Sequence, residues 1–146
     1  MRVRDLMARA LITRGPRTTV PEARHVMRES RIRHLPVVED DRLIGLVTDR
    51  DIRQNMPSPA TSLSEWEIGY LLHRLTLEHV MTKAVITVSP ERSAYDAARL
   101  MLDCRIGALP VVDEGRLVGI VTEADFVRAF ADGRAPSTEV AAACAR

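Results

Sequence analysis

The sequence predicts a mixed α/β (α+β) fold made of two β-α-β-β-α repeats that are related by a pseudo-twofold axis. Shifting the chain by 74 residues aligns 3–55 with 77–129 without a gap, and 19 of the 53 aligned pairs are identical. Within each copy, short β-branched runs alternate with segments whose apolar residues recur at helical spacing. Two copies are too few for a solenoid, so we expect a pair that packs face to face.

The repeat divides the 146 residues into four parts. A copy of about 50 residues buries little apolar surface by itself, so we expect the two copies to share one core. The predicted parts are a first repeat over 1–56, a linker with a helix over 57–76, a second repeat over 77–132 and a C-terminal tail over 133–146.

Each copy begins in the same way. Arg4 to Ala8 predicts a short helical turn, and Ala10 to Thr13 predicts a strand that Gly15-Pro16 ends. A helix then starts at Thr19 or Val20, with Pro21 in its first turn, where a missing N–H is harmless. Its inward face has four positions in each copy: Ala23, Val26, Met27 and Ser30, matched by Ala97, Leu100, Met101 and Cys104.

The second half of each copy predicts a hairpin followed by a helix. Leu35 to Val38 forms the first strand, Glu39 to Asp41 an acidic turn, and Leu43 to Val47 the second strand. A helix opens at Thr48. In the second copy the turn contains Gly115, which suits a left-handed turn position.

The segment between the copies predicts a linker, Pro57 to Ser62, and then a helix from about Leu63 to Arg74. Ser62-x-x-Glu65 and Ser64-x-x-Glu67 are both possible capping boxes. Leu63, Trp66 and Tyr70 recur at i, i+3 and i+7. We expect Trp66 to anchor this helix onto the domain or onto a partner subunit, and stacking on a ligand base is the alternative.

Composition and charge exclude several classes of protein. The net charge is +1, from 21 basic and 20 acidic residues, and five residues are aromatic, so nucleic acid is not an expected partner. No apolar run approaches the ~18 residues of a membrane span, and no signal peptide is visible. We therefore expect a cytoplasmic protein without a membrane partner.

The sequence contains no recognisable catalytic or metal-binding motif. Cys104 and Cys144 lack ligand spacing, and the four histidines form no zinc-binding set. We expect Cys104 to be a small buried helix residue and Cys144 a tail thiol. A nucleophile elbow, a P-loop and a plausible Cys–His pair are all missing, so the prediction is a protein that is not an enzyme and has no catalytic residue, no metal and no required cofactor.

Two strand-to-helix junctions carry the chemistry that a nucleotide needs. Thr48 and Thr122 each lie where a helix begins, and the unpaired N–H groups there favour a phosphate. Asp51 and Asp125, one turn later, can accept from ribose hydroxyls. Thr-x-x-Asp is equally a variant of the capping box, and the spacing alone leaves both roles open.

The paired Leu-Pro-Val-Val strands (35–38 and 109–112) and the paired Gly-x-Val-Thr-x-x-Asp junctions (45–51 and 119–125) resemble a tandem pair of CBS domains, or Bateman module. The segment 58–65 is also similar to that of stand-alone bacterial CBS-pair proteins of the acetoin-utilisation accessory type. The resemblance implies clefts between the copies that bind AMP, ADP, ATP or S-adenosylmethionine, and assembly into a homodimer.

The same resemblance implies which residues line the two clefts, with apolar residues flanking the adenine and Arg50 adding charge to the second cleft. The first cleft is expected to use Ile12, Thr13, Arg33, His34, Pro36, Thr122 and Asp125. The second is expected to use Ile86, Thr87, Gly107, Ala108, Pro110, Thr48, Asp51 and Arg50.

The copies differ where Arg33-His34 is replaced by Gly107-Ala108. We expect the Arg33/His34 cleft to prefer more phosphorylated ligands, and the alternative is two solvated side chains. The leading hypothesis is a regulatory module that senses adenine nucleotides and signals through an effector protein or through self-association. The alternatives are a ligand-free dimerisation scaffold and a sensor of an adenosyl ligand such as S-adenosylmethionine.

Overall fold

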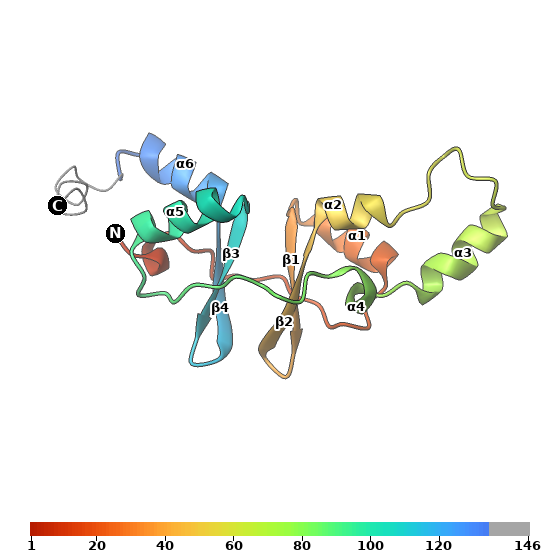
Figure 1. Cartoon of the computed structure of the whole chain (residues 1–146), viewed down its shortest axis with the longest axis horizontal. Helices are drawn as coiled ribbons and strands as arrows, with labels where there is room; N and C mark the ends of the chain where they lie inside the picture. Colours follow the sequence, from red (N-terminus) through yellow and green to blue (C-terminus); the bar gives the residue numbers. More distant parts are fainter. Residues whose placement is uncertain (135–146) are drawn as a thin grey trace. The chain divides into compact units, whose positions relative to one another are not determined.

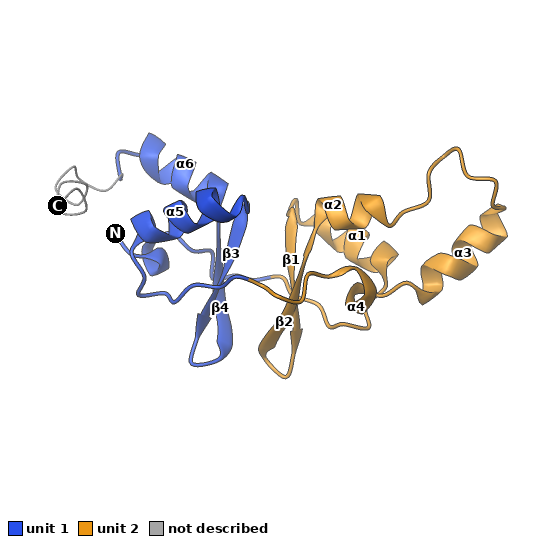
Figure 2. Ribbon diagram, in the orientation of Figure 1, with its two compact units in different colours: residues 1–11, 86–146 blue, residues 12–85 orange. Residues whose placement is uncertain are grey.

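The computed structural model describes residues 1–134, which form two compact units. Unit 2 contains residues 12–85, and unit 1 contains residues 1–11 together with the chain from Ile86 onward (Figure 2). The units therefore do not follow the repeats, because the first eleven residues pack with the second repeat. Most of the predicted tail, from residue 135, lies outside the described residues, as does Cys144.

The fold is α+β, as predicted, and each unit contains one two-stranded antiparallel sheet (Figure 1). Unit 2 is built from α1 (Val20–Glu29), β1 (His34–Glu39), β2 (Arg42–Thr48), α2 (Asp49–Gln54), α3 (Glu65–Arg74) and α4 (Leu77–Val80). Unit 1 is built from the 3-10 helix η1 (Val3–Asp5), α5 (Ala94–Cys104), β3 (Ala108–Asp113), β4 (Arg116–Thr122) and α6 (Glu123–Ala131).

Local sequence explains where these helices and turns begin. The Thr19 hydroxyl accepts from the Glu22 N–H at 3.4 Å at the start of α1, and Ser93 accepts from Asp96 at 3.1 Å at the start of α5. The β3–β4 turn uses Gly115 at φ +79°, as predicted. The β1–β2 turn reaches the same left-handed region with Asp41 at φ +62°, a conformation that Asp tolerates better than most residues.

The prediction of a strand over 10–13 is wrong. Residues 10–13 belong to no strand, and the next residue, Arg14, forms a single parallel bridge to Val37. Its N–H donates to the Pro36 carbonyl at 3.3 Å, and its carbonyl accepts from Val38 at 3.0 Å. Gly15-Pro16 follows at once, and proline has no N–H with which to continue a ladder. Val88 makes the equivalent single bridge to Val111.

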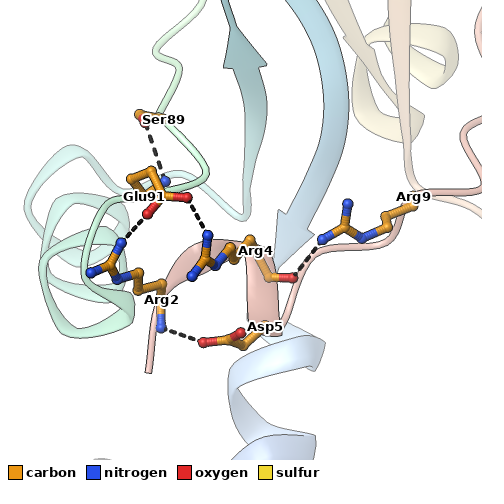
Figure 3. A network of polar contacts seen from close by, with 6 residues as sticks. All are labelled: Arg2, Arg4, Asp5, Arg9, Ser89 and Glu91. Carbon is orange, nitrogen blue, oxygen red and sulfur yellow. Dashed lines mark hydrogen bonds and ion pairs between the residues drawn. The ribbon is translucent and has the colours of Figure 1, made fainter.

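The N-terminal residues 1–11, here called the first exchanged segment, complete the fold of unit 1. Val3 and Arg4 donate backbone hydrogen bonds to Arg92 and Pro90 at 2.9 and 3.0 Å. The Glu91 carboxylate accepts from the guanidinium of Arg2 and from that of Arg4, the latter at 2.6 Å (Figure 3). These ion pairs are about half exposed and contribute little, so the backbone and apolar contacts hold the segment.

Residues 77–85, the second exchanged segment, do the same for unit 2. The N–H of Leu77 donates to the Thr18 carbonyl at 2.9 Å. Leu46 and Thr82 exchange two hydrogen bonds of 3.0 and 2.9 Å, as Ile120 and Ala8 do in unit 1 at 3.1 and 2.9 Å. Each segment thus begins one repeat in the sequence but completes the sheet and core of the other repeat.

Each unit has a hydrophobic cluster of its own, which differs from the single shared core that the repeat length predicts. Val3 in unit 1 and Leu77 in unit 2 are completely buried at equivalent places. The exchanged segments add the apolar surface that a 50-residue copy lacks. One cluster is Val3, Met7, Val88, Ala97, Met101, Leu109, Val111 and Val121; the other is Val20, Ala23, Met27, Leu35, Val37, Val47, Ile52 and Leu77.

Two glycines allow the exchanged segments to approach the strands. A Cβ on Gly119 would lie 2.6 Å from Met7 Sδ and 3.0 Å from the Ala8 carbonyl oxygen. A Cβ on Gly45 would lie 2.8 Å from Met81 Cγ. The glycine of each Gly-x-Val-Thr motif is therefore required for packing against a methionine rather than for an unusual φ.

Trp66 and Cys104 are both exposed. Trp66 is 85% exposed and does not anchor α3 onto the described part of the chain, because the half-buried positions of this helix are Ile68 and Leu72. Its anchoring onto a partner subunit stays a prediction. Of the two capping boxes, Ser64 and Glu67 form the one at the start of α3. Cys104 is exposed rather than buried. It is the last residue of α5, and the next residue, Arg105, has a left-handed backbone conformation that ends the helix.

The glycine contacts predict unequal effects of two substitutions. Gly119→Ala is expected to reduce the free energy of unfolding by about 1–3 kcal/mol, the usual range for an overpacked site. Gly45→Ala is expected to cost less, because the flexible Met81 side chain can move whereas the Ala8 backbone cannot. Urea denaturation measures both, and Gly69→Ala on the open side of α3 is the control, with no loss of stability. Equal stability of wild type and Gly119→Ala would contradict this account.

Candidate functional site

The hairpin register of unit 2 places Arg33 and His34 beside the first junction, which we define as Thr48 and Asp51. His34 lies opposite Thr48 in the β1–β2 pair. The Asp49 N–H donates to the Arg33 carbonyl at 2.9 Å. Two segments that are far apart in the sequence, one before β1 and one after β2, thus meet at the same end of the sheet.

Unit 1 repeats this arrangement with smaller side chains. Ala108 lies opposite Thr122, and the Glu123 N–H donates to the Gly107 carbonyl at 3.1 Å. Thr122 and Asp125 form the second junction. The hairpin register and this backbone hydrogen bond are the same in both units, so the replacement of Arg33-His34 by Gly107-Ala108 changes the side-chain chemistry at this end of the sheet while the strand pairing is kept.

The first junction forms a capping box. The Thr48 N–H donates to Asp51 Oδ2 at 2.9 Å, and the Asp51 N–H donates to Thr48 Oγ1 at 3.1 Å. The capping role that the spacing left open is therefore confirmed. Both residues are half-buried, and among the described residues nothing donates to Asp51 Oδ1. That oxygen remains able to accept a hydrogen bond from a ligand hydroxyl.

In the second junction, both carboxylate oxygens of Asp125 have partners within the unit. The Thr122 N–H donates to Asp125 Oδ2 at 2.8 Å, and the Thr122 hydroxyl lies 3.1 Å from the same oxygen. Arg128 lies 3.4 Å from Asp125 Oδ1 through an exposed guanidinium. A ligand hydroxyl would replace this long contact, which is of the exposed kind that contributes little.

The predicted cleft residues that come before the first helix of each repeat differ in exposure. Ile12 and Thr13 are half-buried, whereas Ile86 and Thr87 are exposed. Pro36 and Pro110 are fully buried, and their carbonyls accept from Arg14 and Val88. Both prolines thus serve the sheet, and their predicted place in the clefts stays a prediction.

The structure divides each predicted cleft between the two units. Unit 2 brings together Ile12, Thr13, Arg33, His34 and Pro36 with Thr48, Arg50 and Asp51. Unit 1 brings together Ile86, Thr87, Gly107, Ala108 and Pro110 with Thr122 and Asp125. Each unit thus contributes residues to both predicted clefts, and the assembly of either complete cleft stays a prediction.

One group of residues was missed by the sequence analysis. A cavity in unit 2 is lined by five arginines, of which Arg33 alone was predicted to bind a ligand. The signal was present in the repeat, because Arg24, Arg28 and Arg53 align with Ala98, Leu102 and Val127. Comparing the copies position by position would have separated these arginines from the many others in the chain.

Within residues 1–134, no group of three or more His, Cys, Asp or Glu side chains is placed to hold a metal ion. No helix in this part of the chain is long and apolar enough to cross a membrane.

Comparison with known proteins identifies the duplicated unit. The family model for the CBS domain matches residues 3–58 and again 77–132. The chain belongs to the CBS domain family. Both matches include the Leu-Pro-Val-Val strand and the Thr–Asp junction, so the two sequence motifs that define the repeat lie inside the two CBS domains.

Curated relatives carry the CBS pair in different settings. Inosine-5'-monophosphate dehydrogenase of Korarchaeum cryptofilum is 38% identical over 85% of this chain, which spans 23% of that protein. The CBS domain-containing protein YhcV of Bacillus subtilis is 32% identical, and the match covers 85% of this chain and 81% of YhcV. The chain therefore spans about a quarter of the dehydrogenase and most of YhcV.

Three solved CBS structures are similar over nearly the whole chain. AcuB of Vibrio cholerae, described as a putative acetoin utilization protein, is 32% identical with a TM-score of 0.75, covering 90% of this chain and 91% of its own. CBSX2 in complex with AMP is 30% identical with a TM-score of 0.77, covering 92% and 99%. The CBS pair of MJ0100, with 5'-methylthioadenosine and S-adenosyl-L-methionine, is 29% identical with a TM-score of 0.75, covering 91% and 98%.

Proposed function

We propose that this CBS pair is a regulatory module that binds an adenine nucleotide, AMP, ADP or ATP, in clefts formed by residues of both repeats. The observation that supports this most is the first junction, where the capping box leaves Asp51 Oδ1 able to accept. Ribose recognition needs a fixed carboxylate. The AMP complex of the similar CBSX2 supports the choice of ligand.

The chemistry assigns a role to each kind of residue. Asp51 and Asp125 accept from the ribose hydroxyls, and Thr48 and Thr122 bind a phosphate or ribose oxygen. Ile12 and Thr13 complete one site with Thr122 and Asp125, while Ile86 and Thr87 complete the other with Thr48 and Asp51. Because each site draws on both repeats, a bound ligand links them, which is what a sensor requires.

The two sites differ in charge. The first contains Arg33 and His34, and guanidinium groups bind phosphate through paired hydrogen bonds. The second contains Gly107 and Ala108 there, and Arg50 is its nearest proposed cation. We therefore assign the more phosphorylated ligands to the first site. An adenosyl ligand without phosphates, as in MJ0100, fits the second.

Ligand binding is tested by thermal shift with AMP, ADP, ATP, S-adenosylmethionine and NAD. A ligand at ~100 times its Kd adds about 2.7 kcal/mol of stability. We expect a shift with at least one adenine nucleotide, reduced in Asp51→Ala and in Asp125→Ala. Asp96→Ala is the matched control, since Asp96 occupies the same turn of α5 without a ligand role.

Two outcomes would overturn this function. No shift with any compound at millimolar concentration would favour the ligand-free scaffold. A shift with S-adenosylmethionine alone would replace the nucleotide by a different adenosyl ligand. Asp51→Asn distinguishes capping from binding, because its amide oxygen still caps Thr48 while the carboxylate charge is lost.

Arg33→Ala tests the charge difference between the sites. Losing one hydrogen bond to a charged group costs about 1.5–3 kcal/mol. ATP affinity is therefore expected to fall about tenfold or more, whereas AMP affinity changes little, as measured by calorimetry. Arg42→Ala, an exposed arginine at the far end of the same hairpin, is the control. Equal losses for ATP and AMP would contradict the assignment.

The signal is proposed to pass through an effector protein or through a homodimer of this chain. Leu102 on α5 and Val127 and Phe130 on α6 are 72%, 68% and 75% exposed. Large apolar side chains gathered on a surface mark interaction sites. The same surface supports self-association as the output of ligand binding.

Light scattering tests the homodimer. Wild type is expected to have the mass of a dimer in the micromolar range, and Phe130→Glu to have that of a monomer, because a charge cannot be buried unpaired in an apolar interface. Leu71→Glu makes the same kind of change on α3 and is expected to leave the dimer intact. A monomeric wild type, or dissociation by Leu71→Glu alone, would overturn the placement.

A further inference from the structure

A cavity of about 720 Å³ lies within unit 2, between α1, α2 and residues 56–59. Its apolar lining comes from Met27, Ile32, Ile52 and Met56, of which Met27 and Ile52 belong to the core. Its volume lies in the range of pockets that take small organic ligands. Neither Thr48 nor Asp51 lines the cavity, whereas Arg33 and Asp49, which meet beside the first junction, do.

The charge around this cavity is strongly unbalanced. Arg24, Arg28, Arg31, Arg33 and Arg53 line it, with Asp49 as the only lining acid. Arg53 lies 3.6 Å from Asp49, and its side chain is 75% exposed. Within residues 1–134, the side chains of the other four arginines make no hydrogen bond or ion pair with another residue. Gathered cations repel one another, and an anion would relieve that repulsion.

The second repeat shows that the fold does not need these arginines. Unit 1 has the same helices and the same turn, but it has neutral residues at four of the five positions. The exception is Arg31, which aligns with Arg105, and both adopt a left-handed φ near +53°. The four replacements are Ala98 for Arg24, Leu102 for Arg28, Gly107 for Arg33 and Val127 for Arg53.

Helix electrostatics explain part of the pattern at most. Arg28 and Arg53 lie in the last turns of α1 and α2, where a cation interacts favourably with the helix dipole. The helix dipole does not explain why arginines from two helices line the same cavity, or why Arg24 and Arg33, which are outside these last turns, line it as well. The feature that Arg24, Arg28, Arg33 and Arg53 share is the cavity and not a helix end.

We propose that this cavity is a second binding site, for a small molecule with a diphosphate or triphosphate group, either free or as the tail of a nucleotide. Guanidinium forks match phosphate oxygens in geometry and charge. The apolar lining can accept a base if the ligand is a nucleotide. This site goes beyond the proposed adenosyl clefts and requires neither junction.

Calorimetry with inorganic triphosphate at low salt tests the site on the full chain. The variant Arg28→Leu/Arg53→Val copies the residues of the second repeat, which the same fold already accommodates. We expect its affinity to fall at least tenfold, a loss of about 1.4 kcal/mol. The control Arg17→Leu/Arg42→Leu removes two exposed arginines of unit 2 outside the cavity and is expected to change affinity by less than about twofold, as screened surface charges do.

The junction variant Asp51→Ala/Asp125→Ala separates this inference from the proposed function. We expect it to leave triphosphate binding unchanged. Loss of triphosphate binding in the junction variant but not in Arg28→Leu/Arg53→Val would overturn the cavity site and leave the adenosyl clefts standing. No binding at millimolar triphosphate, or equal losses in both arginine pairs, would also overturn it.

Calorimetry on the variant Asp51→Ala/Asp125→Ala distinguishes a nucleotide from a free polyphosphate. If this variant binds ATP at least tenfold more tightly than triphosphate, the ligand of the cavity is a nucleotide whose base contacts the apolar lining. Equal affinities assign a free polyphosphate. In either case the arginine pair must weaken the binding.

Discussion

The reciprocal packing of the exchanged segments is the contact on which the structure depends. Val3 begins the first CBS domain but is buried in the core of unit 1, which is built mainly from the second domain. Leu77 begins the second CBS domain but is buried in the core of unit 2, which is built mainly from the first. Each segment also adds a backbone bridge, Ala8 to Ile120 and Thr82 to Leu46. Neither repeat has a complete core without the first residues of the other, so the two CBS domains are bound to fold as a pair.

The same contact positions the candidate site. The bridged residues Leu46 and Ile120 lie two positions before Thr48 and Thr122 on the same strands. Each Thr–Asp junction is therefore supported by a segment from the opposite repeat, through a glycine that lets a methionine pack on the strand.

Most of the fold could be predicted from the sequence because the repeat presents each signal twice. The hairpins, the capped helices and the two junctions follow from local spacing that holds in both copies. The exchange could not be predicted, because Val3 and Leu77 are both apolar and their local sequence does not indicate which repeat buries them. The predicted strand over 10–13 is wrong because Gly15-Pro16 leaves a single bridging residue. The i, i+3, i+7 spacing of Leu63, Trp66 and Tyr70 marks the exposed face of α3, so of the roles predicted for Trp66 only contact with a partner subunit or a ligand stays a prediction.

The candidate site divides in the same way. The junctions could be predicted from two short motifs, whereas the arginine cavity arises from residues on two helices that no motif connects. What distinguishes those arginines is the internal comparison. Equivalent positions carry Arg28 and Arg53 in one repeat and Leu102 and Val127 in the other, while the Gly-x-Val-Thr-x-x-Asp junctions and the Leu-Pro-Val-Val strands are identical in their named residues. The duplicated fold thus keeps its two motifs while the equivalent surfaces diverge, one toward arginines and the other toward apolar side chains. The proposed anion site in unit 2 and the proposed dimer surface in unit 1 both rest on this divergence.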